Sequence, residues 1–245
     1  KTTVQAVSES LKDAPIYLAD GHHRYETALQ FRDIQRAEGV RGGEETEEAG
    51  HNFVMMSLIE IQDPGLLVLP YHRVIRELSH VESEQMMALI NETFDIQLLN
   101  VRLDRTEAAV SHLEELLEKA SLNQVALGLM ESREGRVSLL TLRNPPGASS
   151  HPLQRCAIQV LGKSVLDPVL ETQQGAVERG ALHFTHDSKE VHHLLMNRDY
   201  QLGFILPPLP LDLFEEVVLS GERMPLKSTY FSPKLPTGLV INRLG

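Results

Sequence analysis

The chain has 245 residues, of which 42% are hydrophobic, enough to bury the core of one large domain or two small ones. Its formal charge of −11 argues against a general nucleic-acid-binding surface, which would be basic, but leaves room for a small basic pocket. A single cysteine, Cys156, excludes an internal disulfide framework, and no apolar run approaches the roughly 20 residues that cross a bilayer. We therefore expect a cytoplasmic globular protein without membrane partners, whose cysteine is a small core residue.

The N-terminal part is predicted to run helix, strand, helix. Apolar residues at helical spacing predict a first helix that stops at Pro15. Residues 15–19 form a short apolar run typical of a buried strand, and Asp20-Gly21 ends it. From His22 the spacing is again helical and continues to about Ala37.

The turn between this strand and helix concentrates polar groups. A helix N-terminus offers free backbone N–H groups and a partial positive charge, so the amides of residues 21–24 could hold a phosphate that Arg24 clamps. His23 could donate a proton to a phosphate oxygen or leaving group, and Asp20 or Glu26 could bind Mg²⁺ or act as a base. The alternative is that Asp20 caps the helix and the histidines are surface residues.

A second His-Arg pair follows a predicted hairpin. After an acidic, glycine-rich connector, residues 53–61 are apolar almost throughout, which predicts a strand buried on both faces. The turn at residues 62–65 leads into a second strand from Leu66 to Leu69. If this hairpin packs beside the first strand, His72 and Arg73 could reach the same anion; otherwise they are a surface pair.

The middle of the chain predicts a supporting α+β module. It comprises a helix over 79–94, a strand over 95–100, a helix to about Ala120, and a hairpin of residues 125–130 and 137–142. We find no catalytic constellation in this stretch. Residues 144–150 then form a proline-rich linker.

Histidines return in the C-terminal part. Residues 158–171 are mostly helical, and residues 182–187 alternate as a strand that ends in His186-Asp187. His183, His186 and Asp187 could be metal ligands, but His183 and His186 lie on opposite faces of an ideal strand. We favour His186 and Asp187 as a pair that supports the site or handles a proton.

The polar tail supplies further side chains that could bind a phosphate. A strand over 202–206 and a helix over 211–219 precede a proline-rich stretch from Glu222 to Pro236. We expect Tyr230 and Phe231 to anchor this tail while cationic and hydroxyl side chains reach the central anion site; the alternative is a simple closing loop. These candidates are Arg223, Lys227, Ser228, Thr229 and Lys234.

Three segments, residues 19–28, 63–73 and 221–236, resemble domain-of-unknown-function family 1015. Members of that family carry a further section before the first strand, which predicts that part of the first domain lies outside this sequence. Gly21, His23 and Arg24 are also similar to the phosphate-binding box of the ParB and sulfiredoxin superfamily. That superfamily includes nucleotide-binding partition proteins, an ATP-using reductase and kinases for free serine.

The expected fold class is α/β to α+β. A small mixed sheet is expected to carry the phosphate site, in which a strand leads through a glycine turn into a helix, as in the ParB and sulfiredoxin superfamily. A supporting α+β module is expected to pack beside it. The expected domains are residues 1–76, 77–143 and 151–245, with the tail folding back on the motif. The expected function is binding of a nucleotide or other phosphorylated small molecule, with phosphoryl transfer or hydrolysis as in a small-molecule kinase, and with Mg²⁺ as the cofactor. Two alternatives stay open, a nucleotide-sensing module without turnover and a structural protein without ligand, and no oligomeric state is predicted.

Overall fold

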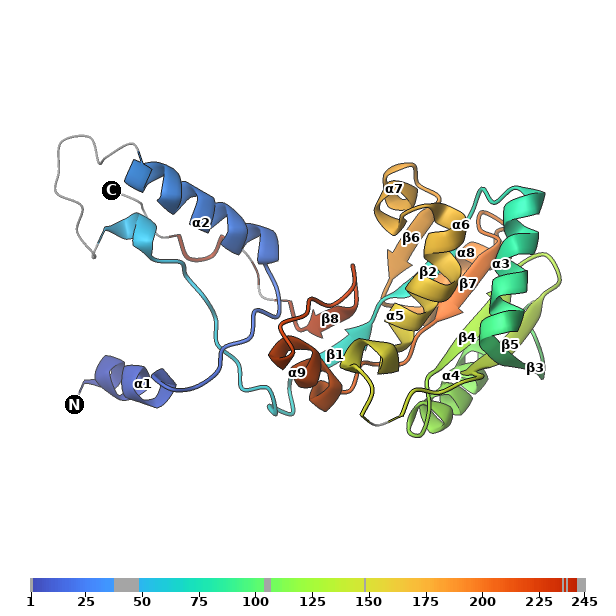
Figure 1. Ribbon diagram of the computed structural model, residues 1–245, viewed down its shortest axis with the longest axis horizontal. Coiled ribbons are helices and arrows are strands. Elements are labelled where there is room, and N and C mark those ends of the chain that lie inside the picture. The colour runs from blue at the N-terminus through green and yellow to red at the C-terminus, as the bar shows by residue number, and fades with distance from the viewer. Residues whose placement is uncertain are drawn as a thin grey trace. The chain divides into compact units, whose positions relative to one another are not determined.

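The computed structural model describes residues 2–37, 49–103, 107–147, 149–234, 236 and 238–241. The chain divides into two compact units: unit 1 is Lys1–Leu66 with Pro233–Gly245, and unit 2 is Leu67–Ser232 (Figure 1). Unit 2 contains both helices and strands, so the predicted mixed α/β class is confirmed. The predicted division into three domains stays a prediction, because a domain is defined by independent folding as well as by compactness.

Unit 1 is built from helices. Helix α1 (Thr3–Leu11) begins with a capping box between Thr2 and Gln5. Helix α2 (His22–Ala37) has the bounds that the spacing predicts, and the 3₁₀ turn η1 (Gly50–Asn52) contacts its end, where Arg36 Nη2 donates to Asn52 Oδ1 at 2.7 Å. No residue of α1 or α2 is buried.

Two strands predicted in unit 1 are wrong. Residues 15–19 and 53–60 carry no strand, and Ile16, Phe53 and Met55 are 56%, 61% and 62% exposed. An apolar run becomes a strand only when another segment offers it a hydrogen-bonding ladder, and no described segment pairs with either run. The expected hairpin is therefore also wrong: β1 (Leu67–Pro70) pairs antiparallel with the distant β8 (Thr229–Ser232).

Unit 2 is organised around a six-stranded sheet with the order β3-β5-β4-β7-β2-β6. All its neighbouring strands are antiparallel, and β4 and β5 form the hairpin that the sequence predicts. The strands are β2 (His72–Ile75), β3 (Phe94–Arg102), β4 (Ala126–Glu131), β5 (Arg136–Leu142), β6 (Leu182–Thr185) and β7 (Leu202–Ile205).

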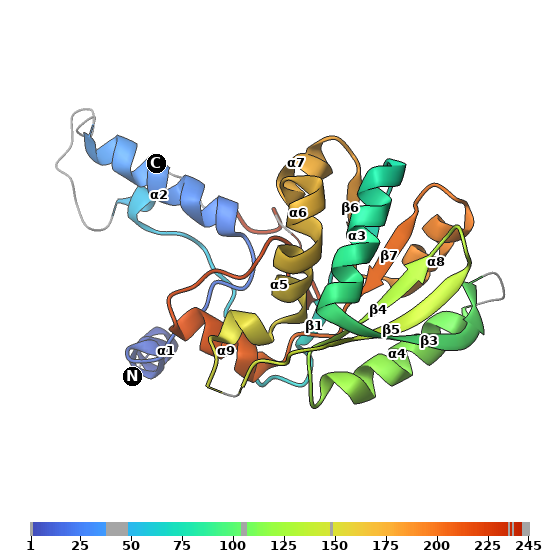
Figure 2. The same cartoon turned by 45° about the vertical axis from the view of Figure 1, so that its right-hand side comes forward.

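Helices cover both faces of this sheet (Figures 1 and 2). Alternation along β4 sends Leu127 and Leu129 into a core with α3, α5 and α6, and sends Met130 into a second core with α4 and α8. The helical elements are α3 (His80–Thr93), α4 (Ala108–Ser121), η3 (Pro152–Arg155), α5 (Ala157–Leu161), the π-helical turn η4 (Gly162–Leu166), α6 (Asp167–Leu170), α7 (Gln173–Glu178), α8 (Ser188–Met196) and α9 (Leu211–Leu219). Within the described ranges, no helix is both long enough and apolar enough to cross a membrane.

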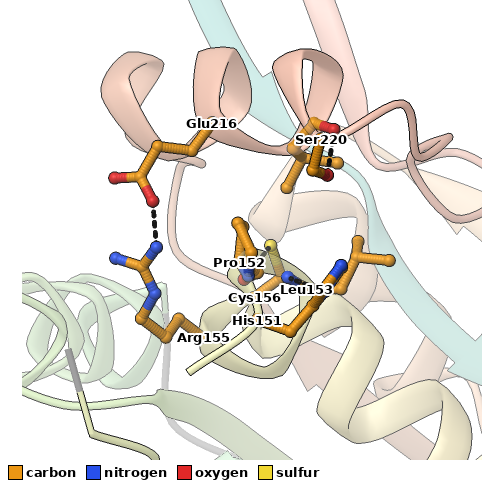
Figure 3. Close-up of polar contacts among 8 residues, drawn as sticks. His151, Pro152, Leu153, Arg155, Cys156, Glu216 and Ser220 are labelled. Carbon is orange, nitrogen blue, oxygen red and sulfur yellow. Dashed lines mark hydrogen bonds and ion pairs between the residues drawn. The ribbon is translucent and has the colours of Figure 1, made fainter. Parts of the chain in front are cut away.

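Cys156 lies in the first of these cores, as predicted. It is 1% exposed, its Sγ donates to the carbonyl oxygen of Pro152 at 3.5 Å, and burial raises the pKa of its thiol to about 11. Beside it, an ion pair between Arg155 and Glu216 joins η3 to α9 (Figure 3). Because the thiol stays protonated at neutral pH, the cysteine acts as a packing residue.

Gly203 in β7 lies in close contact with α8. A Cβ added there would lie 2.6 Å from Val191 Cγ1 and 2.8 Å from Leu195 Cδ1. We expect Gly203→Ala to lower the free energy of unfolding by about 1–3 kcal/mol through overpacking. Gly147→Ala is the control, because a Cβ at Gly147 would meet only Ser150 Oγ, at 4.0 Å. Urea unfolding of both variants checks this, and equal midpoints would contradict it.

Candidate functional site

The turn that begins α2 has the backbone geometry of a tight loop. Gly21 has φ +84°, a left-handed conformation that favours glycine, and Tyr25 N donates to its carbonyl oxygen at 3.0 Å. The Arg24 side chain folds back over this glycine, since a Cβ on Gly21 would lie 2.8 Å from Arg24 Nη2. Glycine is therefore favoured here for two reasons: it readily adopts a positive φ, and its lack of a Cβ leaves room for the Arg24 guanidinium.

Two cations meet at Asp20. Lys234 Nζ lies 3.1 Å from Asp20 Oδ1, and Arg24 Nη2 lies 3.6 Å from Oδ2. Partial burial acts to raise the pKa of Asp20, but the hydrogen bond and charge of Lys234, the Gly21 amide and the Arg24 charge together lower it below its ordinary value. Asp20 is therefore an ionised carboxylate at neutral pH, and Lys234 from the tail lies beside it.

The donor set does not fit a Mg²⁺ site in this arrangement. Both carboxylate oxygens of Asp20 face cations, and nowhere in the described ranges do three His, Cys, Asp or Glu side chains come together as metal ligands. Mg²⁺ prefers several oxygen ligands, usually carboxylates with waters and substrate phosphates.

The side chains of His22, His23 and Glu26 lie on the outside of α2. The His23 side chain is fully exposed, and its Nδ1 lies 3.7 Å from Glu26 Oε2, one turn along the helix. His22 is exposed at the first helical position. These groups are accessible to a ligand in solution, and none is held inside the protein.

His72 and Arg73 are buried in unit 2, so the surface-pair alternative is wrong. His72 Nδ1 accepts from Leu206 N at 3.2 Å, and burial, aided by the Arg73 charge, lowers the pKa of His72 to about 4. Arg73 donates to the carbonyl oxygens of Leu226 and Lys227 at 2.9 and 3.0 Å, and also to that of Tyr71. Both side chains are therefore hydrogen-bonded to backbone groups of unit 2.

Arg73 is a buried cation with no carboxylate contact among the described residues. It is 0% exposed, its Cζ lies 4.8 Å from the Phe184 ring centroid, and burial lowers its pKa to about 9. Its Nε has no acceptor in the described part of the chain. The guanidinium thus stays charged at neutral pH and fixes the loop that contains Leu226 and Lys227.

Apart from Lys234, the tail residues predicted to bind a phosphate belong to unit 2. Ser228 is buried and its Oγ donates to the Pro225 carbonyl at 2.6 Å, while Thr229 begins β8. Lys227 has φ +51°, and its Nζ lies 5.2 Å from the Tyr71 ring centroid. Arg223 is exposed at the start of the same loop.

His186 and Asp187 have structural contacts. Asp187 caps α8, since its Oδ1 accepts from Lys189 N at 2.9 Å. His186 stacks on Tyr230 with ring centroids 4.3 Å apart and planes 3° from parallel. Tyr230 therefore anchors the tail, as predicted, through a partner that the sequence does not indicate.

The residues that line a cavity in unit 2 were not predicted as a group. Unit 2 contains a cavity of about 490 Å³ whose lining includes Tyr71, Arg76 and Tyr200 together with Lys227. Only Lys227 belongs to the predicted site. The other lining residues could not be grouped from their spacing, because they come from three separate segments of the chain, 71–76, 177–184 and residue 200.

Several solved structures are similar to the chain. A conserved hypothetical protein from Pyrococcus furiosus is 15% identical with a TM-score of 0.48, over 95% of this chain and 84% of that one. A free serine kinase in complex with AMP is 15% identical with a TM-score of 0.47, over 93% and 78%. A mutant free serine kinase in complex with ADP is 14% identical with a TM-score of 0.45, over 93% and 79%. These TM-scores lie below 0.5, so the likeness says nothing of what this chain binds.

Sequence comparison gives the family. No curated protein matches the chain. The profile of the family described as "Protein of unknown function (DUF1015)" matches residues 1–169, which is more than half of the chain, and the chain therefore belongs to that family.

Proposed function

We propose that the chain binds a nucleotide or another phosphorylated small molecule at the turn from Asp20 to Arg24, and that it transfers or hydrolyses the phosphate group. One observation carries the proposal: Arg24 and Lys234 lie within 3.6 Å of one carboxylate at the start of a helix. All three side chains are at least 36% exposed, so a phosphate can reach them. Two cations at the N-terminus of a helix form an anion-binding arrangement.

Each group then has a role that its geometry supports. The guanidinium of Arg24 would bind two phosphate oxygens while Lys234 binds a third, and Asp20 would hold both cations in place. Asp20 is a poor proton acceptor because its pKa is lowered. Glu26 would therefore be the base that takes a proton from the acceptor hydroxyl or water, and His23, 3.7 Å from Glu26, would donate to the leaving group.

A nucleotide-sensing role without turnover is the second candidate. In unit 1, Phe53, Met55 and Ile59 are 61%, 62% and 49% exposed. Single exposed apolar side chains are common on protein surfaces, but these three lie within one short segment. A surface of this kind could be covered by a partner when a nucleotide is bound. This candidate uses the same turn and differs only in the absence of a product.

Incubation of the protein with ATP, ADP or CTP and Mg²⁺, followed by chromatography, separates the two candidates. We expect one nucleotide to raise the melting temperature by roughly 5–10 °C at 100 times its Kd and to give a product that depends on the protein. A thermal shift without product would favour the sensing module. No thermal shift with any nucleotide would contradict both candidates and favour a structural protein.

A further inference from the structure

Unit 2 contains an open cavity of about 490 Å³ beside the edge strand β6. Three aromatic rings and three basic side chains contribute to its wall: Tyr71, Phe184, Tyr200, Arg76, His183 and Lys227. None of the lining residues is a carboxylate, although the chain as a whole has a charge of −11. A concave site that is both aromatic and cationic is suited to a ring compound that carries a negative charge.

The local structure fixes Arg76 in this wall. Its Nε donates to the Gly180 carbonyl at 2.7 Å, and its Cζ lies 5.5 Å from the Tyr200 ring centroid. Gly180 has φ +76°, and a Cβ there would lie 2.9 Å from Arg76 Nη2, so glycine makes room for the guanidinium. The contact with Glu77, 3.7 Å away, is an exposed ion pair of small energy, which leaves the Arg76 charge available to a ligand.

Lys227 is held at the cavity by a buried partner. Its φ of +51° is unusual for a residue with a side chain, and such a conformation persists only where the surrounding structure holds it. Arg73 imposes it: this fully buried guanidinium donates to the carbonyls of Leu226 and Lys227. The resulting backbone places Lys227 Nζ 5.2 Å from the Tyr71 ring, at the cavity wall. A buried cation thus positions an exposed one.

We propose that this cavity is a binding site for a small planar ring compound bearing a phosphate or carboxylate group. The ring lies against Tyr200 and Phe184, and the anionic group contacts Lys227 and Arg76. A volume of about 490 Å³ suits a ligand of nucleotide size. The site lies entirely within unit 2, so it does not depend on the turn of unit 1 that the proposed function uses.

Calorimetric titration of the full chain with AMP, adenosine, ribose 5-phosphate and 4-hydroxybenzoate tests the ligand class. We expect binding by AMP, by 4-hydroxybenzoate or by both, which separates a nucleotide from an aromatic acid as the source of the anion. Adenosine lacks the charge and ribose 5-phosphate lacks the flat ring, so each should bind at least about tenfold more weakly than AMP if AMP binds. Failure of both ring-bearing anions to bind up to millimolar concentration would overturn the proposal.

Matched variants locate the binding. Lys227→Gln should weaken binding at least about tenfold, because a charge-assisted contact is lost, without changing the melting temperature. Tyr200→Leu keeps apolar bulk but loses the ring, and we expect a decrease of about threefold or more. Lys163→Gln, an exposed lysine outside the cavity wall, is the control and should bind as the wild type does.

Arg24→Gln distinguishes this proposal from the proposed function. Binding that survives Arg24→Gln but is weakened by Lys227→Gln supports the cavity. Binding that is lost in Arg24→Gln and unchanged in both Lys227→Gln and Tyr200→Leu would overturn the cavity and leave the turn of unit 1 standing. Should both turn and cavity bind AMP, the titration has two phases, and each variant removes one of them.

Discussion

Arg24→Gln is expected to weaken nucleotide binding at the unit 1 turn by about 10- to 100-fold. Glutamine keeps a polar side chain of similar length but loses the charge and the paired N–H groups that contact two phosphate oxygens. A hydrogen bond to a charged group contributes about 1.5–3 kcal/mol, which corresponds to this range. The Kd of ADP, measured by calorimetry on wild type and variant, gives the ratio directly.

Arg32→Gln on the same helix is the matched control. Arg32 lies two turns after Arg24 and pairs with its neighbour Asp33 at 2.8 Å, so its loss should leave the Kd unchanged. Arg24→Lys should recover part of the affinity, because it restores the charge without the forked geometry. If Arg24→Gln binds ADP as tightly as the wild type, the proposed phosphate site is wrong.

The second large effect is acid destabilisation through His72. Burial, aided by the Arg73 and His186 charges and opposed by Asp187, lowers the folded-state pKa of His72 from its ordinary 6.5 to about 4. Above pH 6.5 the imidazole is neutral in both states. Between pH 6.5 and about pH 4, His72 is protonated in the unfolded chain but stays neutral in the folded chain. The free energy of unfolding therefore decreases as the pH falls through this range. The loss approaches about 3 kcal/mol, at about 1.4 kcal/mol for each pKa unit.

His72→Gln isolates this contribution. The glutamine side-chain oxygen can accept the Leu206 N–H bond that His72 Nδ1 now accepts, but it takes up no proton. Urea unfolding at pH values from 7 to 4 should therefore show a shallower decline for the variant than for the wild type. His193→Gln changes an exposed histidine of α8 and should follow the wild-type curve. Parallel curves for His72→Gln and wild type would show that His72 does not titrate as argued.

Local patterns in the sequence predicted elements whose stability is local. The bounds of α2 and α9 and the hairpin of β4 and β5 follow from helical spacing and from a turn at residues 131–135. By contrast, β8 lies in a polar, proline-flanked stretch and is a strand only because β1 pairs with it. Residues 53–60 show the converse, an apolar run that has no described partner strand. Pairing between distant segments is not encoded in the periodicity of either one.

The candidate site was predictable in the same uneven way. The turn at Gly21 and the nearby Arg24 follow from sequence neighbours, whereas the contact between Lys234 and Asp20 joins the two ends of the chain. The burial of Arg73 could not be predicted either, because two of its acceptors are carbonyl groups more than 150 positions away, and a carbonyl group carries no side-chain signature. A resemblance to a family indicates which residues matter, but not whether they bind a ligand or the backbone.

The ladder between β1 and β8 has a consequence for the architecture of the gene product. The chain enters unit 2 at Leu67 and leaves it at Ser232, and these two residues are direct partners in that ladder. Unit 2 is therefore an insertion within unit 1, and its entry and exit points lie about one strand spacing, roughly 5 Å, apart. Such adjacency allows an inserted module to be gained or lost by recombination at a single surface position, without breaking the continuity of its host.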